Sequence, residues 1–286
     1  MSEPQTPRIL DARIEAEKIR TMYKDDLTQR TFKALVLGEK GTGKTRLLQT
    51  ARLPVHIDSF DTGGTQTLED IIKRGDIIAD TRYEADDPLG PFAFSEWRRN
   101  MEQRMRGKYF ESLGTYCLDS CTTWSDSIMY WVQDQAEKAD KTGKLKILGT
   151  APRRNHDYAP QKVQIGVWLK RILSLPCDVI VTGHLYGVYE STHLDDGTVE
   201  ERLVAYRFMS TGKGTVTIPL PFSEMWVMRT KPSSRGAEYQ ILTGRSGLYQ
   251  GTTRIGREGR FELFEPADVK KLLKKAGWPT ADKEKL

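Results

Sequence analysis

The sequence has little of what marks secreted, membrane and disordered proteins. Three cysteines in 286 residues are too few for a disulfide framework, which favours a reducing cytosolic setting. There is no apolar run of about 18 residues, so we expect no transmembrane helix. Residues 1–10 lack the apolar stretch of a secretory signal. Glycine and proline, at 24 and 13 residues, are too ordinary for a collagen-like or broadly disordered chain.

The sequence also lacks a strong excess of one charge, because 44 Lys and Arg against 39 Asp and Glu leave a net charge of +5. So small a charge permits a nucleic-acid partner without requiring one. Its distribution is more informative. Residues 1–30 sum to zero, whereas residues 141–171 hold eight basic residues and one acidic residue, a local charge of +7. The positive charge is therefore concentrated in one segment.

The pattern along the chain predicts three regions. Residues 1–30 are polar, and a helical pattern over 11–23 predicts an N-terminal helical arm. Residues 31–262 form the predicted core. Residues 263–286 predict a basic C-terminal helix and tail, with Pro266 in the first turn of the helix.

Short apolar strands alternate with helical patterns in the first part of the core, which predicts a mostly parallel central sheet flanked by helices. We expect its strands at residues 32–37, 55–58, 77–79, 115–118 and 178–182. We expect its helices at residues 45–51, 95–109, 122–139 and 161–175, with Ser95 as a cap. Short β segments then predict antiparallel strands toward the C-terminus, at 187–189, 216–218, 225–228 and 239–242.

One motif after the first strand points to a phosphate-binding loop. The sequence matches G-x-x-x-x-G-K-S/T, the P-loop pattern, at Gly38, Glu39, Lys40, Gly41, Thr42, Gly43, Lys44 and Thr45. Glycines let such a loop curl so that its backbone N–H groups and the following helix N-terminus face phosphate oxygens. In this pattern Lys44 reaches the β and γ phosphates of ATP, and the Thr45 hydroxyl ligates Mg²⁺.

A P-loop needs an acidic partner for Mg²⁺ and a group that orients the attacking water. Asp119 ends a predicted strand and is our candidate for the metal, although it also suits a helix cap. Ser120 follows it, so the water-orienting base must come from elsewhere. We predict Asp61, with Asp58 as the alternative. His184 follows another strand and suits a sensor of the γ-phosphate as well as it suits a structural role.

The order of these motifs resembles that of the RecA-like P-loop ATPases. A P-loop is followed by Ile57-Asp58-Ser59-Phe60-Asp61-Thr62-Gly63-Gly64, then by strands ending in Asp119-Ser120 and in Thr182-Gly183-His184. Within that superfamily, the sequence is similar to phage-encoded nucleotide-binding proteins that include single-strand annealing ATPases. The resemblance covers about residues 31–255 and implies an α/β RecA-like P-loop NTPase fold.

The resemblance assigns roles to single positions. Lys44 and Thr45 match the phosphate and Mg²⁺ residues, and Asp119 matches the acid of the second nucleotide motif. His184 matches the γ-phosphate sensor. Asp61 stands where the family has a catalytic Glu, and this shorter side chain departs from the pattern.

Relatives in this family assemble head-to-tail into rings or filaments with ATP at the subunit interfaces. The resemblance therefore implies a homo-oligomer in which one subunit supplies a cation to its neighbour's site. Arg254 is our first candidate for that cation, and Arg245 and Lys213 are the alternatives.

The resemblance also places two connecting segments near single-stranded DNA. In the basic segment, phosphate contacts and base stacking would come from Lys144, Lys146, Arg153, Arg154 and Tyr158, with Trp168 nearby. A solvated charged loop is the plainer interpretation. The second segment, residues 185–215, carries four acids between Asp195 and Glu201 and gives a weaker signal.

The sequence thus predicts a Mg²⁺-dependent ATPase that binds single-stranded DNA in phage recombination or replication, acting in the host cytoplasm and not at a membrane. Three alternatives stay open: a DNA-translocating or packaging motor of another P-loop branch, a small-molecule kinase, and a non-catalytic protein that assembles with ATP.

Overall fold

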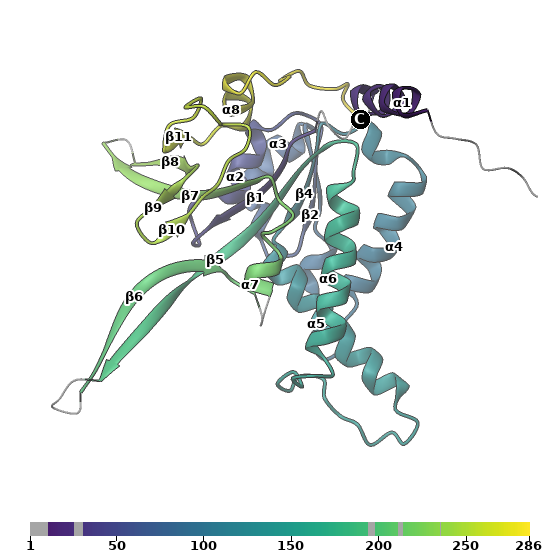
Figure 1. Cartoon of the computed structure of the whole chain (residues 1–286). Coiled ribbons are helices and arrows are strands. Elements are labelled where there is room, and N and C mark those ends of the chain that lie inside the picture. The colour runs from purple at the N-terminus through teal and green to yellow at the C-terminus, as the bar shows by residue number, and fades with distance from the viewer. Residues whose placement is uncertain (1–10, 26–30, 194–197, 211–213, 235) are drawn as a thin grey trace, which may run out of the picture.

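A nine-stranded sheet with helices on both faces forms the body of the chain in the computed structural model, which describes residues 11–25, 31–193, 198–210, 214–234 and 236–286 (Figure 1). Its strands are β1 (Lys33–Gly38), β2 (Val55–Ser59), β3 (Ile77–Asp80), β4 (Thr115–Asp119), β5 (Asp178–His193), β6 (Val199–Phe208), β7 (Glu224–Ser233), β8 (Gly236–Leu242) and β11 (Phe264–Pro266). A separate ribbon pairs β9 (Arg245–Ser246) with β10 (Tyr249–Gln250).

The strand order is β11-β8-β7-β1-β5-β4-β2-β3, with β6 added to β5. All pairings from β7 through β1 to β3 are parallel, whereas β6, β8 and β11 pair antiparallel with their neighbours. The predicted mostly parallel sheet with antiparallel strands toward the C-terminus is confirmed. Because β1, β2, β4 and β5 run in one direction, the residues at their carboxyl ends meet along one edge of the sheet.

The helices are α1 (Ala12–Asp25), α2 (Lys44–Leu47), α3 (Glu69–Lys73), α4 (Ala93–Arg106), α5 (Cys121–Ala139), α6 (Tyr158–Leu173), α7 (Gly214–Thr217) and α8 (Val269–Lys275). Short 3₁₀ turns occur at η2 (Leu48–Thr50), η3 (Gly64–Leu68), η4 (Arg82–Ala85) and η5 (Tyr109–Glu111). None of the described helices is long and apolar enough to cross a membrane.

Alternation along β1 builds one hydrophobic core on each face of the sheet. Leu35 and Leu37 belong to the first core, which α4, α5 and α6 cover with the buried rings of Trp97, Trp124 and Trp168. Ala34 and Val36 belong to the second core, beneath α2 and α8. Side chains buried on both faces explain why the central strands are continuous apolar runs in the sequence.

The C-terminal segment is part of the packed core. β11 pairs with β8, and Val269, Leu272 and Leu273 of α8 are buried in the second core. The predicted boundary near residue 263 therefore does not separate a tail from the core. Pro266 ends β11, and Asp268 caps α8 in its place by accepting the N–H of Lys271 at 3.0 Å.

Two other local predictions are wrong. Ser95 lies inside α4 and is not its cap. Asp86 instead accepts the N–H groups of Phe92 and Ala93 at the start of this helix, at 2.9 and 3.0 Å. Residues 216–218 were expected as a strand, yet Gly214–Thr217 forms the short helix α7, in which the N–H of Ile218 bonds to the Gly214 carbonyl. The β propensity of three residues is overridden by that helical bond.

The strand expected at 187–189 is the continuation of β5, which runs on to pair with β6 over nine residue pairs. The two strands form a long hairpin that projects from the body (Figure 1). The helical pattern at 11–23 is confirmed as α1, whose apolar residues Ile14, Ile19 and Met22 are exposed.

Candidate functional site

The loop between β1 and α2 has the backbone that its glycines predict. Gly41 and Gly43 have φ values of 81° and 84°, in the left-handed region that favours glycine. A side chain at Gly43 would also meet the ring of Tyr239, whose Cδ1 lies 2.6 Å from the position of a Cβ atom. The close approach of these two segments therefore requires glycine for both backbone conformation and space.

Lys44 lies inside the curve of this loop and is only 7% exposed. Its ammonium group donates to the carbonyl oxygens of Gly38 and Glu39, both at 2.9 Å. Burial lowers the pKa of Lys44, and the nearby carboxylates of Asp119 and Asp61 oppose that shift. The loop thus holds a buried cation at the place where the motif needs one for phosphate oxygens.

Thr45 and Asp119 are brought together from α2 and β4. The Thr45 hydroxyl donates to Asp119 Oδ2 at 2.8 Å, and the Thr182 hydroxyl donates to the other carboxylate oxygen. Asp119 is 1% exposed, and burial raises its pKa despite these bonds. A hydroxyl and a carboxylate are hard oxygen donors of the kind Mg²⁺ prefers, so this pair fits that ion.

Asp61 follows β2, and its carboxylate is held by side chains from two other elements. The hydroxyls of Ser120 and Thr123, before and within α5, donate to Asp61 Oδ1. His184 Nε2 lies 3.1 Å from Asp61 Oδ2. Burial alone would raise the pKa of Asp61, but the bonds from His184, Thr123 and Ser120 outweigh it and leave the pKa below its ordinary value.

The tautomer of His184 follows from its two neighbours. Its Nδ1 lies 3.4 Å from Lys44 Nζ, and an ammonium group can only donate. Nδ1 must therefore accept, which leaves the proton on Nε2 to be donated to Asp61. The imidazole links the lysine of the P-loop to the carboxylate after β2.

One cavity of about 700 Å³ contains all five of these predicted residues, namely Lys44, Thr45, Asp61, Asp119 and His184. Its volume lies in the range of small-molecule sites. The sheet topology explains the convergence, because these side chains come from the carboxyl ends of parallel strands or from the segments that follow them.

Three further side chains of the same cavity, Glu84, Asp126 and Tyr239, were not found from the sequence. Glu84 lies in η4, Asp126 in α5 and Tyr239 in β8. Burial, followed by the charge of Asp61, raises the pKa of Asp126 to about 6. None of the three stands in a recognisable motif, so only the tertiary structure identifies them.

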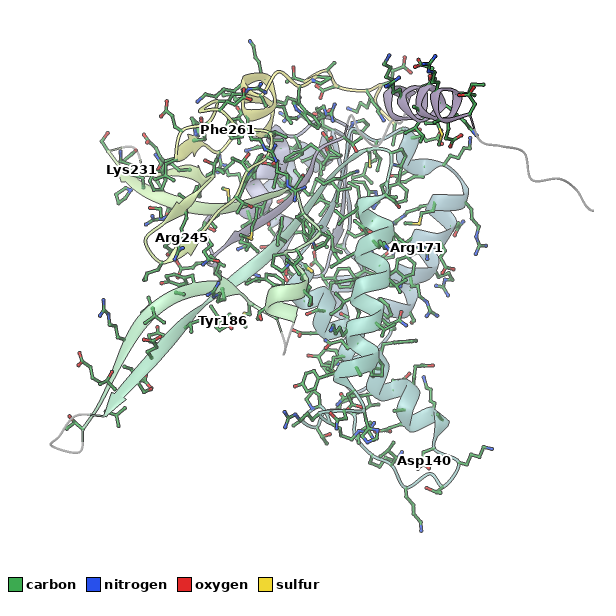
Figure 2. The ribbon with its side chains drawn as sticks, viewed as in Figure 1. Asp140, Arg171, Tyr186, Lys231, Arg245 and Phe261 are labelled. Carbon is green, nitrogen blue, oxygen red and sulfur yellow. The ribbon has the colours of Figure 1, made fainter. Side chains whose placement is uncertain are left out.

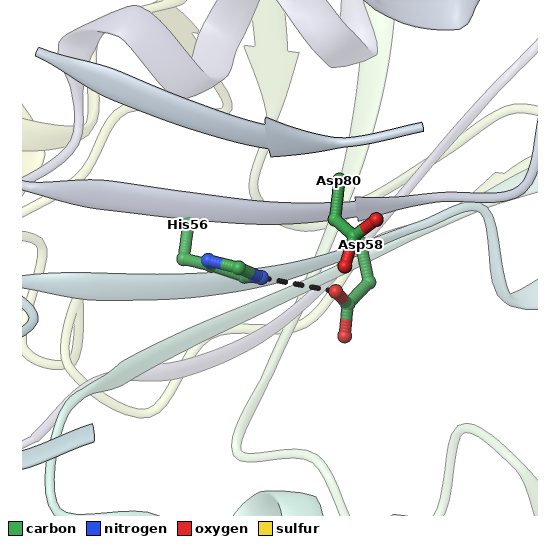
Figure 3. Close-up of side chains that lie close together, drawn as sticks. All are labelled: His56, Asp58 and Asp80. Atoms are coloured by element: carbon green, nitrogen blue, oxygen red, sulfur yellow. Dashed lines mark hydrogen bonds and ion pairs between the residues drawn. The ribbon is translucent and has the colours of Figure 1, made fainter. Parts of the chain in front are cut away.

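Asp58, the alternative to Asp61, is buried in a different network. Its carboxylate is completely covered and accepts bonds from Trp97, Tyr116 and Arg104 at 2.8–2.9 Å. His56 Nε2 lies 3.0 Å from Asp58 Oδ1 (Figure 3). Asp58 is completely buried and, unlike Asp61, is not among the residues that line the cavity, so its position favours a structural role.

His56, Asp58 and Asp80 lie close enough together to suggest a metal site (Figure 3). The guanidinium group of Arg104 bridges the two carboxylates, at 2.8 Å from Asp58 and 2.5 Å from Asp80. The chain therefore supplies its own cation to this cluster. These contacts tie α4 to the ends of β2 and β3.

The candidates for a cation donated to a neighbouring subunit lie outside the described cavity lining. Arg254 and Arg245 are exposed, and Arg245, labelled in Figure 2, is the first residue of β9. The backbone N–H of Arg254 is fixed by Glu224 at 2.7 Å. Lys213 lies outside the described residues.

The candidate DNA-binding residues lie in the connection between α5 and α6 and at the start of α6. This connection extends from the body past Asp140 (Figure 2). Lys144, Lys146 and Arg154 are exposed, and Tyr158 is half-buried at the start of α6. Arg153 instead pairs with the buried carboxylate of Asp157 at 2.7 Å, a contact that orders the loop.

The role expected for Trp168 beside these residues is wrong. This ring is 2% exposed and packs edge-on against Trp97 in the first core, with centroids 4.9 Å apart. It is therefore not available for stacking on a base.

Comparison with known proteins gives one family match and two distant structural likenesses. A family model described as an AAA domain matches residues 30–194, more than half of the chain. No curated protein matches the sequence at a significant level. A KaiC-like protein from the hyperthermophilic archaeon Pyrococcus horikoshii is 12% identical, with a TM-score of 0.40 over 82% of this chain and 84% of that chain. The flagellar accessory protein FlaH from Methanocaldococcus jannaschii is 13% identical, with a TM-score of 0.37 over 85% of this chain and 92% of that chain.

Proposed function

The chain belongs to the AAA domain family and has a RecA-like P-loop fold, and we propose that it is a Mg²⁺-dependent ATPase. One observation carries this proposal. Lys44, Thr45, Asp61, Asp119 and His184 line a single cavity, although they come from four separate parts of the sequence. Together they supply a cation that faces phosphate oxygens, two ligands for a metal and a carboxylate that can orient water. A histidine links the cation to that carboxylate.

The residues present fit both ATP and Mg²⁺. The turn of the loop exposes backbone N–H groups at the start of α2, where anions are stabilised. Lys44 binds the β and γ phosphates by exchanging its bonds to Gly38 and Glu39 for phosphate oxygens. Thr45 and Asp119 would hold Mg²⁺, which would supply positive charge against the phosphates.

Asp61 orients the attacking water and accepts its proton in this proposal. Because the pKa of Asp61 is held below its ordinary value, its carboxylate is ionised at neutral pH and can accept a hydrogen bond from the water. Ser120, Thr123 and His184 fix its direction. This support supplies the positioning that the shorter Asp needs in place of Glu.

The test of the proposal is the hydrolysis of ATP by Lys44→Ala. We expect a fall of about 10²–10³-fold in kcat, because one preorganised cation is lost from the transition state. Lys73→Ala is the matched control, since that side chain is 69% exposed on α3, far from the P-loop in sequence. Hydrolysis by Lys44→Ala at the wild-type rate would overturn the proposal.

Assembly into a ring or filament, with Arg254 acting in the neighbour's site, extends the proposal. The exposure of Arg254 and its fixed backbone support it. Mixing inactive Lys44→Ala with inactive Arg254→Ala subunits tests it, because a mixed interface restores one complete site. Recovered hydrolysis is the expected result, and a mixture no more active than its parts would exclude a role for Arg254 in trans.

Binding of single-stranded DNA, in phage recombination or replication in the host cytoplasm, completes the proposal. It is supported by the exposed cations of the α5–α6 connection, where the charge of the chain is concentrated. Affinity for an oligonucleotide should fall steeply with salt, and neutralising Lys144, Lys146 and Arg154 should flatten that slope. No binding to any single-stranded oligonucleotide would reject this part, and movement along duplex DNA would favour a motor.

A further inference from the structure

Glu84 contacts the chain on both sides of Asp61. One carboxylate oxygen accepts the hydroxyl of Ser59 at 2.6 Å, and the other accepts the backbone N–H of Gly63 at 2.8 Å. The Glu84 carbonyl also accepts the hydroxyl of Thr62 at 3.1 Å. One residue of η4 thus clamps the segment 59–63 at three points.

The element that carries Glu84 is itself anchored in the first core. Tyr83 is 1% exposed, and its ring stacks on Phe60 with centroids 5.1 Å apart. Its hydroxyl bonds to Asp80 at 3.0 Å. Tyr83–Phe60 and Glu84–Ser59 are therefore adjacent contacts between the same two segments, one apolar and one polar, so the clamp has a rigid base.

Asp61 lies at the turn between the clamped points. The N–H of Gly64 bonds to the Asp61 carbonyl at 2.8 Å, and Gly63 has a φ of 68°. A turn at the end of a strand is free to move unless its flanks are fixed. The position of the Asp61 carboxylate over the P-loop therefore depends on what holds residues 59 and 63.

We propose that Glu84 is a positioning residue that holds the turn carrying Asp61, and so sets the carboxylate that orients water for ATP hydrolysis. This inference rests on the proposed ATPase function. Both partners of the Glu84 carboxylate are neutral donors, a hydroxyl and a backbone N–H. The length and hydrogen-bonding geometry of the Glu84 side chain should therefore matter more than its charge.

This distinction makes a sharp test possible with Glu84→Ala and Glu84→Gln. Gln keeps an acceptor for the Gly63 N–H, and its NH₂ group can donate to the Ser59 hydroxyl, which then rotates. We expect Glu84→Ala to lower kcat by about 10–100-fold, the usual effect of losing a supporting contact, and Glu84→Gln to stay within about threefold of wild type. ATP affinity should stay within about threefold in both. If Glu84→Gln loses as much kcat as Glu84→Ala, the residue acts through its charge and the proposal is wrong.

A double-mutant cycle with Asp61→Asn shows whether Glu84 acts through Asp61. Two residues of one unit have non-additive effects. The variant carrying both Glu84→Ala and Asp61→Asn should therefore be no slower than Asp61→Asn alone. Multiplied losses would overturn the proposal. Glu69→Ala is the matched control, because that carboxylate is 64% exposed on α3.

A readout that does not need hydrolysis separates this inference from the proposed function. Amide hydrogen exchange over residues 59–64 should accelerate at least tenfold in Glu84→Ala and stay near wild type in Glu84→Gln, at unchanged melting temperature. Unchanged exchange in Glu84→Ala shows that no clamp exists, even in an active ATPase. Conversely, accelerated exchange in a protein without ATPase activity would confirm the clamp and reject the catalytic function.

Discussion

His184 donates from Nε2 to Asp61 Oδ2 across 3.1 Å, while the other nitrogen of its ring faces Lys44 Nζ at 3.4 Å. One imidazole therefore joins the lysine of the P-loop to the carboxylate that follows β2. In the proposed ATPase, phosphate oxygens at Lys44 would draw its ammonium group away from Gly38 and Glu39 and change the charge that His184 Nδ1 meets. The proposed role of His184 as a sensor of the γ-phosphate follows from this position.

Replacement of His184 by Ala should lower kcat about 10–100-fold and change ATP affinity less than threefold, because the ring supports Asp61 without being a principal phosphate ligand. Steady-state hydrolysis and nucleotide titration measure the two effects. His156→Ala is the control, since that histidine is exposed on the α5–α6 connection. An unchanged kcat would show that His184 has only a structural role.

Removal of the Asp119 carboxylate should raise the demand for Mg²⁺. In Asp119→Asn the metal loses a charged oxygen ligand, so we expect the Mg²⁺ concentration at half-maximal hydrolysis to rise at least about tenfold. Mg²⁺ titration at saturating ATP measures this shift. Chelation with EDTA should abolish hydrolysis by the wild type. Equal Mg²⁺ curves for the two proteins would remove Asp119 from the metal site.

The sequence predicts which side chains meet at the P-loop, because each of these residues is tied to a local signal. Gly41 and Gly43 have the backbone that only glycine adopts easily, and Asp119 and His184 follow recognisable buried strands. Parallel strands then bring their carboxyl ends to one edge, so order along the chain is enough to predict proximity.

The opposite side of the cavity escapes prediction because its contacts are long-range and carry no local pattern. Glu84 is an ordinary acid until η4 packs against residues 59–63. Asp58 is the alternative to Asp61 in the sequence, and only the rings and the guanidinium group from α4 and β4 show that Asp58 is enclosed. Ser95 fails for a different reason, since Asp86 of the preceding loop accepts the N–H groups of Phe92 and Ala93 at the start of the helix.

Replacement of Asp58, the enclosed carboxylate, should lower the stability of the protein and leave its rate of ATP hydrolysis unchanged. Asp58→Ala leaves Arg104, His56, Trp97 and Tyr116 with unpaired buried groups, so we expect a loss of about 3–5 kcal/mol in the free energy of unfolding. Urea unfolding measures it. ATP hydrolysis per folded molecule should stay near wild type, and a large loss of kcat in folded protein would return Asp58 to the list of catalytic candidates.

Replacement of Asp126 by Asn should stabilise the protein by an amount that depends on pH. Burial, then the charge of Asp61, raises its pKa from 3.8 to about 6. The folded protein therefore disfavours the ionised form, and this penalty is absent below about pH 4, grows up to about pH 6 and is complete above it. Asp126→Asn removes the penalty. We expect no change in unfolding free energy at pH 4 and a gain on the order of 2 kcal/mol at pH 8.

Urea unfolding without nucleotide at the two pH values measures this difference. Asp87→Asn is the control, because Asp87 is an exposed acid of the adjacent loop that precedes α4. A gain that is equal at both pH values would come from packing and not from ionisation.

Two neighbouring arginines of the α5–α6 connection should differ in their effects on protein stability and on DNA binding. Arg153 holds the buried Asp157 at 2.7 Å, whereas Arg154 is exposed. Arg153→Ala removes the ion pair and keeps only the backbone N–H of residue 153 on Asp157, so it should lower the melting temperature of the protein. Arg154→Ala should leave stability within about 0.5 kcal/mol of wild type.

For binding of a single-stranded oligonucleotide, we expect Arg154 to matter more than Arg153. Arg154→Ala should weaken affinity and reduce the salt slope by about one, since one phosphate contact is lost from a folded loop. Thermal melting and fluorescence anisotropy across a salt series measure the two quantities on the same samples. If Arg154→Ala binds like the wild type at every salt concentration, the charge of this connection keeps the protein soluble instead of contacting DNA.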